Sequence, residues 1–577
     1  MKRLSFLKAV SIIPFSFGML VPLFCLNSCG ENKTDDSKML DKLEEDTINE
    51  FKAMVHIPRP SDLFLYDVPD NSNCKQISNY LKQRVQELAG IVVNQDKYSN
   101  IWFDVPCNDS KYKNAPTIAL QCHMDMVFAY DPEKLHDPDP MTTEIQVVDE
   151  IKDGKRVIHS KNYETSIGAD NCIGISGILA LISNPDIKHG NLRIIFTNCE
   201  ENAMQGAMML VDGHRNDQGE VITGQEATAP HIMQDVKYVI NLDTGINKSV
   251  CVSSSGAIGS HYNQTFNWAS HTLPRHFKLT VTGFVGGHSA GVPRQGYGNA
   301  LKAANEVLTL LNKDVELISY TTPGTEAYNN VPSQCIIEFF SDAERNDVQN
   351  AINHVVGNHT EVGSEDYWKD MADATLYVEP LETLATHTLS KEDSNKIINL
   401  HKNLWYGFDK ESYDEDRTKT SANVGPATLE YDLTLQQFKF SSSSYSRTDD
   451  EELISSFKQS NLEVATQNGL NYLCDAQFHP WARDANAKLL DLTKDAICYA
   501  INCQKDEIVE SEAHGGLECT WWAYAMNNTE GITDGASTCL GINVMNEHKF
   551  TEAVDVASIK DCMKAVIYIF RNWQKLV

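Results

Sequence analysis

The sequence predicts an α/β fold, in which a discontinuous domain built on a mostly parallel sheet carries a separate, inserted α+β domain. Four short apolar runs, at residues 118–120, 192–196, 238–242 and 540–544, suit fully buried strands. From about residue 259 to residue 470 the pattern changes to alternating and amphipathic segments. A chain of 577 residues is also too long for one ordinary domain of roughly 100–200 residues.

The N-terminal segment indicates export. A basic start precedes an apolar stretch over residues 9–26, which is typical of a secretory signal. The residues from Leu26 to Cys29 resemble the bacterial lipoprotein box, in which the Cys carries the lipid. We therefore expect a signal peptide over residues 1–28, lipid attachment at Cys29 and a polar tether over residues 29–40. The expected localisation is an exported lipoprotein, anchored to a membrane by its lipid in the periplasm or at the cell surface.

The composition excludes one class of partner and one kind of site. The formal net charge is −30, and a surface this negative repels phosphate backbones, so we expect no nucleic-acid partner. No Cys-x-x-Cys pair occurs among the 15 cysteines, and Cys122, Cys199 and Cys539 lie in or beside apolar runs. We expect the cysteines to be mostly small core residues and not zinc ligands.

In the discontinuous domain, expected over residues 41–258 and 471–577, each apolar run is closely followed by residues that can bind a metal. These residues are, in chain order, His123 and Asp125, Glu200 and Glu201, Asp243, and His548. Because ligands bind at the carboxyl ends of strands in open α/β sheets, we expect them to meet in one crevice. A helix expected over residues 175–182, stopped by Pro185, would place Asp170 at its N-terminus, facing the same crevice.

The inserted domain is expected over residues 259–470. Phe277, Leu279 and Val281 alternate as in a half-solvated strand, and residues 301–311 show the spacing of an amphipathic helix. Further strand-like runs occur at residues 335–340, 376–378 and 431–440.

The metal-capable residues are informative only in combination. A single His after an apolar run is more often structural, and an Asp at a helix start is usually a cap. Two His, two Asp and one Glu at the ends of neighbouring strands, however, would be a costly cluster unless a cation balanced it. Imidazole and carboxylate ligands suit zinc, with manganese or cobalt as substitutes, and five ligands fit two ions if one carboxylate bridges them. We therefore expect two divalent metal ions.

The order of these motifs carries a resemblance. The motifs are His123-Met-Asp125, Gly168-Ala-Asp170-Asn171, Glu200-Glu201 and Asn241-Leu-Asp243-Thr244. In this order they resemble the co-catalytic dizinc amidohydrolases, which include aminoacylases, glutamate-releasing carboxypeptidases and dipeptidases. Finer motifs are similar to one branch, the cytosol non-specific or aminoacyl-histidine dipeptidases; they are Ile57 to Ser61, Gly286-Gly-His288-Ser289, Ala513 to Cys519, and His548 followed by Glu552. The resemblance spans roughly residues 45–577 and is thin between residues 342 and 471.

The resemblance implies a function, the hydrolysis of dipeptides or very short peptides by a water that two metal ions activate. One ion would be held by His123, Asp170 and Asp243, and the other by Asp170, Glu201 and His548. The catalytic residues would be Asp125, which orients His123, Glu200 as general base, and His288, which stabilises the oxyanion from the inserted lid.

Recognition of the peptide ends is implied less specifically. Asn329 lies in a lid motif that contacts substrate in the family, and Arg447 and His514 are candidates for binding the free carboxylate. Two alternatives stay open, a solvated Arg447 and a buried, hydrogen-bonded His514. The chain departs from the family at Gly245, where the family pattern is acidic, and in its export leader. A homodimer is left open.

Two other functions are compatible with these residues. A carboxypeptidase or N-acyl amino acid deacylase on the same scaffold would share every metal ligand. A lipid-anchored binding protein that had lost the chemistry would not need Glu200, which is present.

Overall fold

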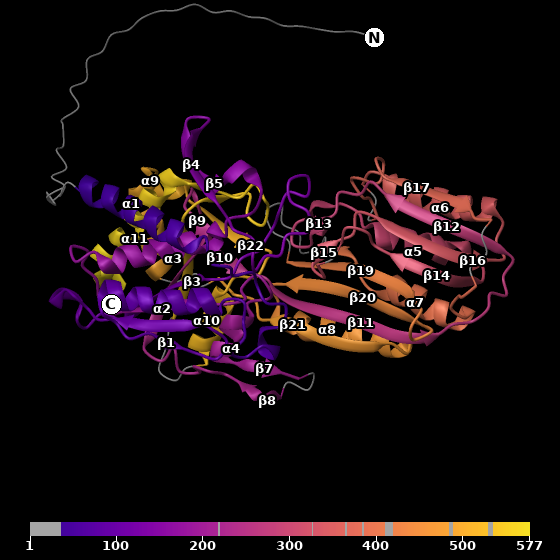
Figure 1. The fold of residues 1–577 in the computed structure, drawn as a ribbon, viewed down its shortest axis with the longest axis horizontal. Coiled ribbons are helices and arrows are strands. Elements are labelled where there is room, and N and C mark those ends of the chain that lie inside the picture. Colours follow the sequence, from indigo (N-terminus) through magenta and orange to yellow (C-terminus); the bar gives the residue numbers. More distant parts are fainter. Residues whose placement is uncertain are drawn as a thin grey trace, which may run out of the picture.

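The chain forms two lobes, which lie end to end along the longest axis of the molecule (Figure 1). The computed structural model describes residues 36–216, 220–325, 327–363, 366–382, 386–409, 419–483, 488–528 and 535–576. Both ends of the chain build the first lobe, and the middle of the chain builds the second. The expected α/β fold, discontinuous and with an inserted α+β domain, is confirmed.

A six-stranded sheet in the order β1-β2-β6-β3-β9-β23 forms the centre of the first lobe. The strands are β1 Asn94–Gln95, β2 Ile101–Val105, β3 Thr117–His123, β6 Leu192–Thr197, β9 Val236–Gly245 and β23 Ala536–Gly541. Strands β3, β6, β9 and β23 run parallel to one another. Strand β2 runs antiparallel to both of its neighbours, β1 and β6. Three of the expected apolar runs lie within these strands. The fourth run, at residues 540–544, overlaps only the end of β23, because the polar Ser537 and Thr538 hide the start of that strand.

Helices cover both faces of this sheet. Side chains alternate along β6, so Ile194 packs in the cluster of α1, α2, α3, α9 and α11, whereas Ile195 packs with α4 and α10. The helices are α1 Ser37–Met54, α2 Lys75–Ala89, α3 Ala169–Ser183, α4 Gln205–Val211, α9 Lys488–Ile501, α10 Cys519–Asn527 and α11 Val556–Arg571. Helix α3 ends two residues before Pro185, as the sequence predicts.

Smaller strands border the first lobe. They are β4 Val147–Lys152, β5 Lys155–Ser160, β24 Val544–Met545 and β25 Ala553–Asp555 in one sheet, β7 Gly213–Arg215 with β8 Val221–Glu226, and β10 Ser249–Ser254 with β22 Val509–Ala513. All cysteines within the described ranges are free thiols.

The expected tether is shorter than the sequence suggested. Helix α1 begins at Ser37, so residues 37–40 are helical. Leu40 and Leu43 are 8% and 0% exposed, and their burial in the core explains the early start of the helix. The expected signal peptide and Cys29 lie outside the described residues.

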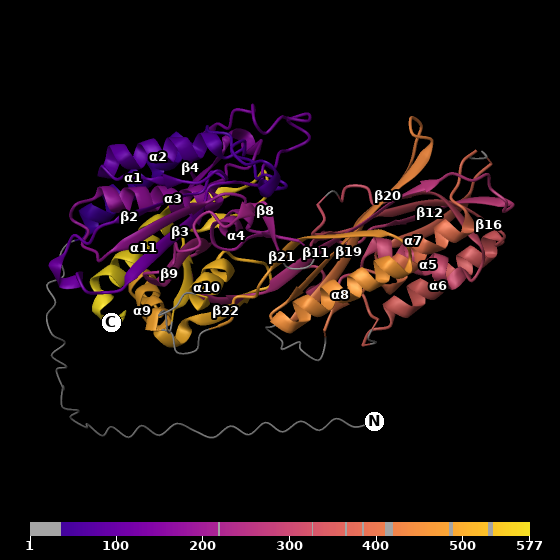
Figure 2. The same ribbon diagram turned by 90° about the horizontal axis from the view of Figure 1, so that it is seen from below.

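The second lobe is built on a nine-stranded antiparallel sheet in the order β17-β12-β16-β14-β19-β20-β11-β21, with β18 beside β19. The strands are β11 Gly256–Asn267, β12 Arg275–Thr282, β14 Val315–Thr321, β16 Cys335–Ser341, β17 Thr375–Pro380, β18 Gly407–Phe408, β19 Thr420–Asp432, β20 Gln437–Thr448 and β21 Asn471–Phe478. The helices α5 Ala300–Leu311, α6 Arg345–Thr360, α7 Lys391–Asn403 and α8 Glu451–Gln467 cover one face of it (Figure 2). The short strands β13 Gly287–His288 and β15 Asn330–Val331 form a separate pair.

Two expectations about this lobe need correction. Residues 431–440 are a hairpin and not one strand, because Asp432 Oδ1 accepts hydrogen bonds from the backbone N–H groups of Thr434 (2.8 Å) and Leu435 (3.0 Å) and reverses the chain. Strand β21 pairs with β11, so residues 471–478 extend the second lobe, beyond its expected end at residue 470.

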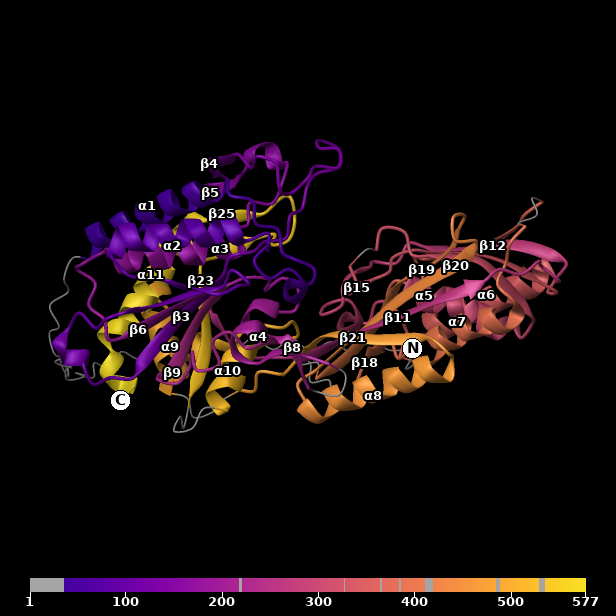
Figure 3. The same cartoon turned by 60° about the horizontal axis from the view of Figure 1, so that its bottom comes forward.

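Two neighbouring segments join the lobes (Figure 3). Strand β10 leads through Ser255 into β11, and the chain returns after β21. Ser254 and Trp481, one on each segment, donate backbone hydrogen bonds to each other over 3.0 and 2.9 Å. Phe478 of the second lobe packs in the same hydrophobic cluster as Trp522 of the first. The junction between the lobes is therefore packed and hydrogen-bonded.

We expect Ile337→Ala to lower the free energy of unfolding of the second lobe by about 2–5 kcal/mol, because it leaves a cavity. Ile337 is 0% exposed in β16, an inner strand of the nine-stranded sheet. The matched control is Leu435→Ala in the hairpin turn, where the side chain is 56% exposed, and the expected change is below about 0.5 kcal/mol. Urea unfolding followed by fluorescence measures both, and equal losses would contradict the described packing.

Candidate metal centre and active site

Two strands and one helix start bring three of the expected metal-capable residues together. His123 ends β3, Asp243 lies near the end of β9, and Asp170 lies in the first turn of α3, where its backbone is extended (φ −78°, ψ 105°). His123 Nε2 lies 3.2 Å from Asp170 Oδ1 and 3.2 Å from Asp243 Oδ1. One ligand atom from each of these residues could therefore contact the same ion.

A second group shares Asp170 with the first. His548 Nε2 lies 3.3 Å from Asp170 Oδ2 and 2.9 Å from Glu201 Oε2. The two oxygens of Asp170 thus face different histidines, which is the arrangement of a bridging carboxylate. His123, Glu200 and Glu201 form a third group of atoms within reach of one another.

Without a cation, the charges in this cluster balance only by the uptake of protons. Burial opposes protonation of the histidines, but the neighbouring carboxylates outweigh it and raise the pKa of His123 and of His548, the latter to about 12. Burial, and then the negative charge of Asp243, raise the pKa of Glu200 well above its ordinary value. Burial and the nearby Asp170 likewise raise the pKa of Asp243. Within the described residues, Glu201 Oε1 is buried without a hydrogen-bond partner. Orphaned carboxylate oxygens beside imidazoles are the donor set of a divalent cation, so the residues fit the two ions that the sequence predicts.

Asp125 is buried behind the cluster and faces His123. Its Oδ1 lies 3.5 Å from His123 Nδ1, on the ring side away from Asp170. The same carboxylate accepts hydrogen bonds from the backbone N–H groups of Glu200 (3.0 Å) and Glu201 (3.2 Å). Burial opposes its ionisation, but His123 and these N–H groups outweigh burial and lower the pKa of Asp125. Asp125 therefore contacts three residues of the cluster: its carboxylate accepts from the N–H groups of Glu200 and Glu201, and its backbone carbonyl oxygen lies 3.2 Å from His123 Nδ1.

The second lobe contributes a separate polar group at its end nearest the first lobe. His288 Nε2 lies 3.3 Å from Asn329 Nδ2 and 3.4 Å from Arg447 Nη2. His288 is exposed to solvent, but desolvation by the groups around its ring and the positive charge of Arg447 lower the pKa of His288 to about 3, so the imidazole is neutral near pH 7. The structure thus brings together three of the residues that the resemblance places near the substrate.

Arg447 is a buried cation without an anionic partner. Its side chain is 3% exposed, and no carboxylate of the described residues forms an ion pair with it. Its contacts are long and neutral, at 3.4 Å to Ser289 Oγ and 3.5 Å to the carbonyl oxygen of His514, and its Cζ lies 4.6 Å from the centre of the Tyr445 ring. Because burying an unpaired charge is costly, this guanidinium is suited to receive an anion.

His514 is held by two serines. Its Nδ1 lies 3.0 Å from Ser255 Oγ at the junction of the lobes, and its Nε2 lies 2.6 Å from Ser421 Oγ of β19. Both ring nitrogens are therefore occupied, and the carbonyl oxygen of His514 accepts from Arg447. The buried, hydrogen-bonded alternative fits this geometry, and direct binding of a carboxylate by the ring does not.

Sequence reasoning assigned no role to a buried carboxylate beneath the cluster. Glu518 is 0% exposed, and its Oε2 accepts hydrogen bonds from Thr197 Oγ1 (2.7 Å) and from Gln121. Asn241 donates to Gln121 and accepts from the backbone N–H of Asp243 (3.0 Å). Glu518 lies in one of the motifs of the sequence, but its contacts could not be predicted, because they join residues far apart in the chain.

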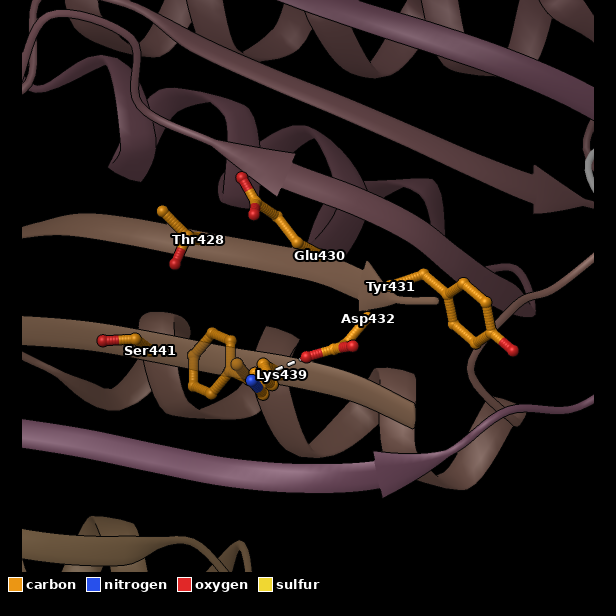
Figure 4. Close-up of a pocket in the computed structure, with 7 residues that line it drawn as sticks. Thr428, Glu430, Tyr431, Asp432, Lys439 and Ser441 are labelled. Atoms are coloured by element: carbon orange, nitrogen blue, oxygen red, sulfur yellow. Dashed lines mark ion pairs between the residues drawn. The ribbon is translucent and has the colours of Figure 1, made fainter. Parts of the chain in front are cut away.

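The pocket in Figure 4 is distant from this cluster. It has a volume of about 520 Å³ and is lined by Thr428, Glu430, Tyr431, Asp432, Lys439, Phe440 and Ser441. Ser421, which contacts His514, is the second residue of β19, whereas Asp432 ends that strand. The pocket therefore lies roughly 35 Å further along the extended chain. Lys439 and Asp432, which both line the pocket, form an ion pair with each other at 2.7 Å.

Comparison with known proteins agrees with this architecture. No protein-family model matches the chain. The cytosol non-specific dipeptidase of Escherichia coli (strain K12) is 24% identical over 500 residues, which are 84% of this chain and 90% of that protein. The crystal structure of the aminoacylhistidine dipeptidase from Vibrio alginolyticus matches with a TM-score of 0.63 and 21% identity, over 91% of this chain and 96% of that one. The chain has the aminoacylhistidine dipeptidase fold.

A tripeptidase from Staphylococcus aureus matches less closely, with a TM-score of 0.50 and 14% identity over 92% of this chain and 98% of that one. The resemblance to the cytosol non-specific and aminoacyl-histidine dipeptidases, which the motifs predicted, is confirmed.

The expected localisation is wrong. The dipeptidase that matches most of this chain is by name a cytosol enzyme, which overturns the expectation of an exported, periplasmic or cell-surface lipoprotein. Among the described residues, no helix is long and apolar enough to cross a membrane. Neither the lipid anchor nor a homodimer gains support from these relatives.

Proposed function

We propose that this chain is a dimetal peptidase that hydrolyses dipeptides and other very short peptides. The observation that carries the proposal is the shared Asp170, whose two carboxylate oxygens face the two groups of ligand atoms. Relatives named as dipeptidases support peptide substrates and confirm the predicted class of enzyme, a metal-dependent hydrolase of dipeptides.

Five residues would hold the two ions. His123, Asp170 and Asp243 would bind one, and Asp170, Glu201 and His548 the other. The mixed imidazole and carboxylate set favours zinc, with manganese or cobalt as substitutes. When bound, the ions would polarise the peptide carbonyl and make a water more acidic.

The remaining polar residues would move the proton and stabilise charge. The backbone N–H of Glu200 donates a hydrogen bond to Asp125, which fixes the position of Glu200. As the general base, Glu200 would take a proton from the attacking water and deliver it to the leaving amine. Asp125 would hold the ring of His123 in its binding orientation. His288, neutral near pH 7, would donate a ring N–H to the developing oxyanion once Nε2 is released from the Asn329 and Arg447 N–H groups that face it here.

The second lobe would select short substrates by binding their free carboxylate. Arg447 is a buried cation with no anionic partner among the described residues, and both Arg447 and Asn329 contact His288. His514 would position Arg447 through its carbonyl oxygen. In this proposal the second lobe, from residue 256 to residue 478, is the lid over a catalytic first lobe. A lid closed over the site leaves little room beyond the second residue of a peptide.

Glu200→Gln and Glu201→Gln should separate the two adjacent glutamates. Glu201→Gln loses a charged ligand, so metal content and activity should fall together. Glu200→Gln should keep both ions while turnover falls by ~10²–10⁴-fold, the usual contribution of a proton shuttle. Elemental analysis beside turnover measures this. If Glu200→Gln loses an ion and Glu201→Gln keeps both, the roles are reversed, and full activity of either variant would exclude the mechanism.

A substrate panel tests the proposed class of reaction. The zinc-loaded chain should cleave dipeptides much faster than N-acyl amino acids or long unstructured peptides, because the lid encloses a short ligand. A deacylase on the same scaffold would prefer the N-acyl amino acids, and a carboxypeptidase would release C-terminal residues from long peptides. A binding protein would turn over none of them.

Arg447→Met should lower kcat/KM for a dipeptide by about 30-fold or more, because it removes the partner of a buried carboxylate. The same dipeptide with an amidated C-terminus should already be a poor substrate and should lose little more. Arg345→Met, an exposed arginine in the first turn of α6, is the matched control and should change neither. Equal losses on the free and the amidated dipeptide would show that Arg447 does not bind the carboxylate.

A further inference from the structure

Two motif residues without an assigned role, Arg59 and Glu552, meet at the loop that presents Asp170. Glu552 is 2% exposed, and its carboxylate points at the backbone of this loop. Its Oε2 accepts hydrogen bonds from the N–H groups of Ile167 (2.7 Å) and Gly168 (2.9 Å), and its Oε1 accepts from the N–H of Asp170 (3.1 Å). One carboxylate thus binds three of four consecutive amides.

Arg59 holds the carbonyl groups of the same loop. Its Nη2 donates to the carbonyl oxygens of Ile167 (3.2 Å) and Gly168 (3.1 Å), while Nη1 donates to those of Met54 (3.2 Å) and Ile57 (3.0 Å). Its side chain is 0% exposed. Within the described residues its hydrogen-bond partners are backbone carbonyls. The guanidinium therefore fastens the Asp170 loop to the end of α1.

The loop needs these contacts because helix α3 does not supply them. Asp170 has an extended backbone, so its N–H and those of Ile167 and Gly168 make no helical hydrogen bond. Gly168 has a φ of 60°, and a Cβ there would lie 2.6 Å from Arg59 Nη2 and 2.8 Å from Met126 Sδ. The guanidinium consequently packs directly on the loop, and only glycine fits beneath it.

We infer that Glu552 and Arg59 form a clamp that fixes the Asp170 carboxylate before any ion binds, and that this clamp sets the affinity of the paired metal site. Glu552 holds the amides of the loop and Arg59 holds its carbonyls, so the loop cannot rotate its carboxylate away from the two histidines. Neither residue is a metal ligand in the proposed set, so both are positioning residues.

The clamp also links the two segments that carry the bridging ligand and the last ligand. Glu552 lies four residues after His548, and both contact Asp170, one at its backbone and one at its side chain. Displacing Glu552 would therefore disturb the positions of both Asp170 and His548. Loss of residues that orient metal ligands commonly costs ~10–100-fold in metal affinity. The inference rests on the proposed function, because it takes Asp170 as the bridging ligand.

Glu552→Gln tests the clamp, since the amide replaces one acceptor oxygen with an N–H₂ group that cannot accept from the loop. We expect the apparent dissociation constant for zinc, measured by competition with a chromophoric chelator on the metal-free chain, to rise by ~10–100-fold. The absorption spectrum of the cobalt-loaded variant should also change, because the ligand geometry changes. Unchanged zinc affinity together with an unchanged cobalt spectrum would overturn the inference.

Glu316→Gln is the matched control. Glu316 is 2% exposed in the second lobe and accepts hydrogen bonds from the backbone N–H groups of Thr272 (2.8 Å) and Leu273 (3.2 Å). Its replacement removes the same kind of contact far from the cluster, so it should lower the thermal midpoint without changing zinc affinity. If Glu316→Gln weakens zinc binding as much as Glu552→Gln, the effect is general destabilisation and the clamp is refuted.

Two further measurements cover a Glu552→Gln chain that does not fold. Arg59→Lys keeps the charge but offers one nitrogen for four carbonyls, and it should weaken zinc binding in the same direction. In the unaltered chain without metal, the amides of Ile167 and Gly168 should be protected from hydrogen exchange; rapid exchange that only zinc suppresses would overturn the inference. If the unaltered chain does not bind two ions at all, the proposed function fails first, which is a distinct outcome.

Discussion

Repulsion among buried carboxylates is the constraint on which the first lobe depends. Parallel strands end at one edge of the sheet, so their terminal acids meet there whether or not their charges balance. Asp170, Asp243, Glu200 and Glu201 lie within reach of one imidazole, His123, and burial raises the pKa of Glu200 and Asp243. A divalent cation offsets this repulsion and also provides the chemistry, so the same feature that opposes folding without metal explains activity with it.

A second set of carboxylates keeps that arrangement in place. Asp125 accepts from the backbone of Glu200 and Glu201, and Glu552 accepts from the backbone around Asp170. Each binds amide N–H groups and so ties a ligand-bearing loop to the core. Backbone N–H groups favour the ionised form of a carboxylate and lower the pKa of Asp125, whereas burial outweighs them at Glu552 and raises its pKa to about 7. The carboxylates of this region thus have two roles: some are positioned to bind the metal ions, and Asp125 and Glu552 hold the backbone that carries them.

The second lobe places a buried cation, Arg447, near the junction of the lobes. Arg447 and His288 lie at its inner end, and His514 links Ser255 at the junction of the lobes to Ser421 of the long strand β19. A buried guanidinium without an anion is unfavourable in the free protein and favourable once a carboxylate arrives. In the proposed function, substrate binding by Arg447 would be coupled to the packing of the two lobes, because the carbonyl oxygen of His514 accepts from Arg447 and the ring of His514 contacts Ser255 at the junction.

The sequence by itself determined the strands, the helix after Asp170 and the residues at the strand ends, because burial and periodicity are local properties of a segment. It could not place β21 in the second lobe, because β21 pairs with the distant strand β11. The hairpin within residues 431–440 is local, but its turn depends on the Asp432 hydrogen bonds, which the strand-like pattern of these residues does not reveal. The motifs around Arg59, Glu518 and Glu552 were visible, but their contacts were not. Only the tertiary structure decided these, because a hydrogen bond between residues hundreds of positions apart leaves no periodic signal in the chain.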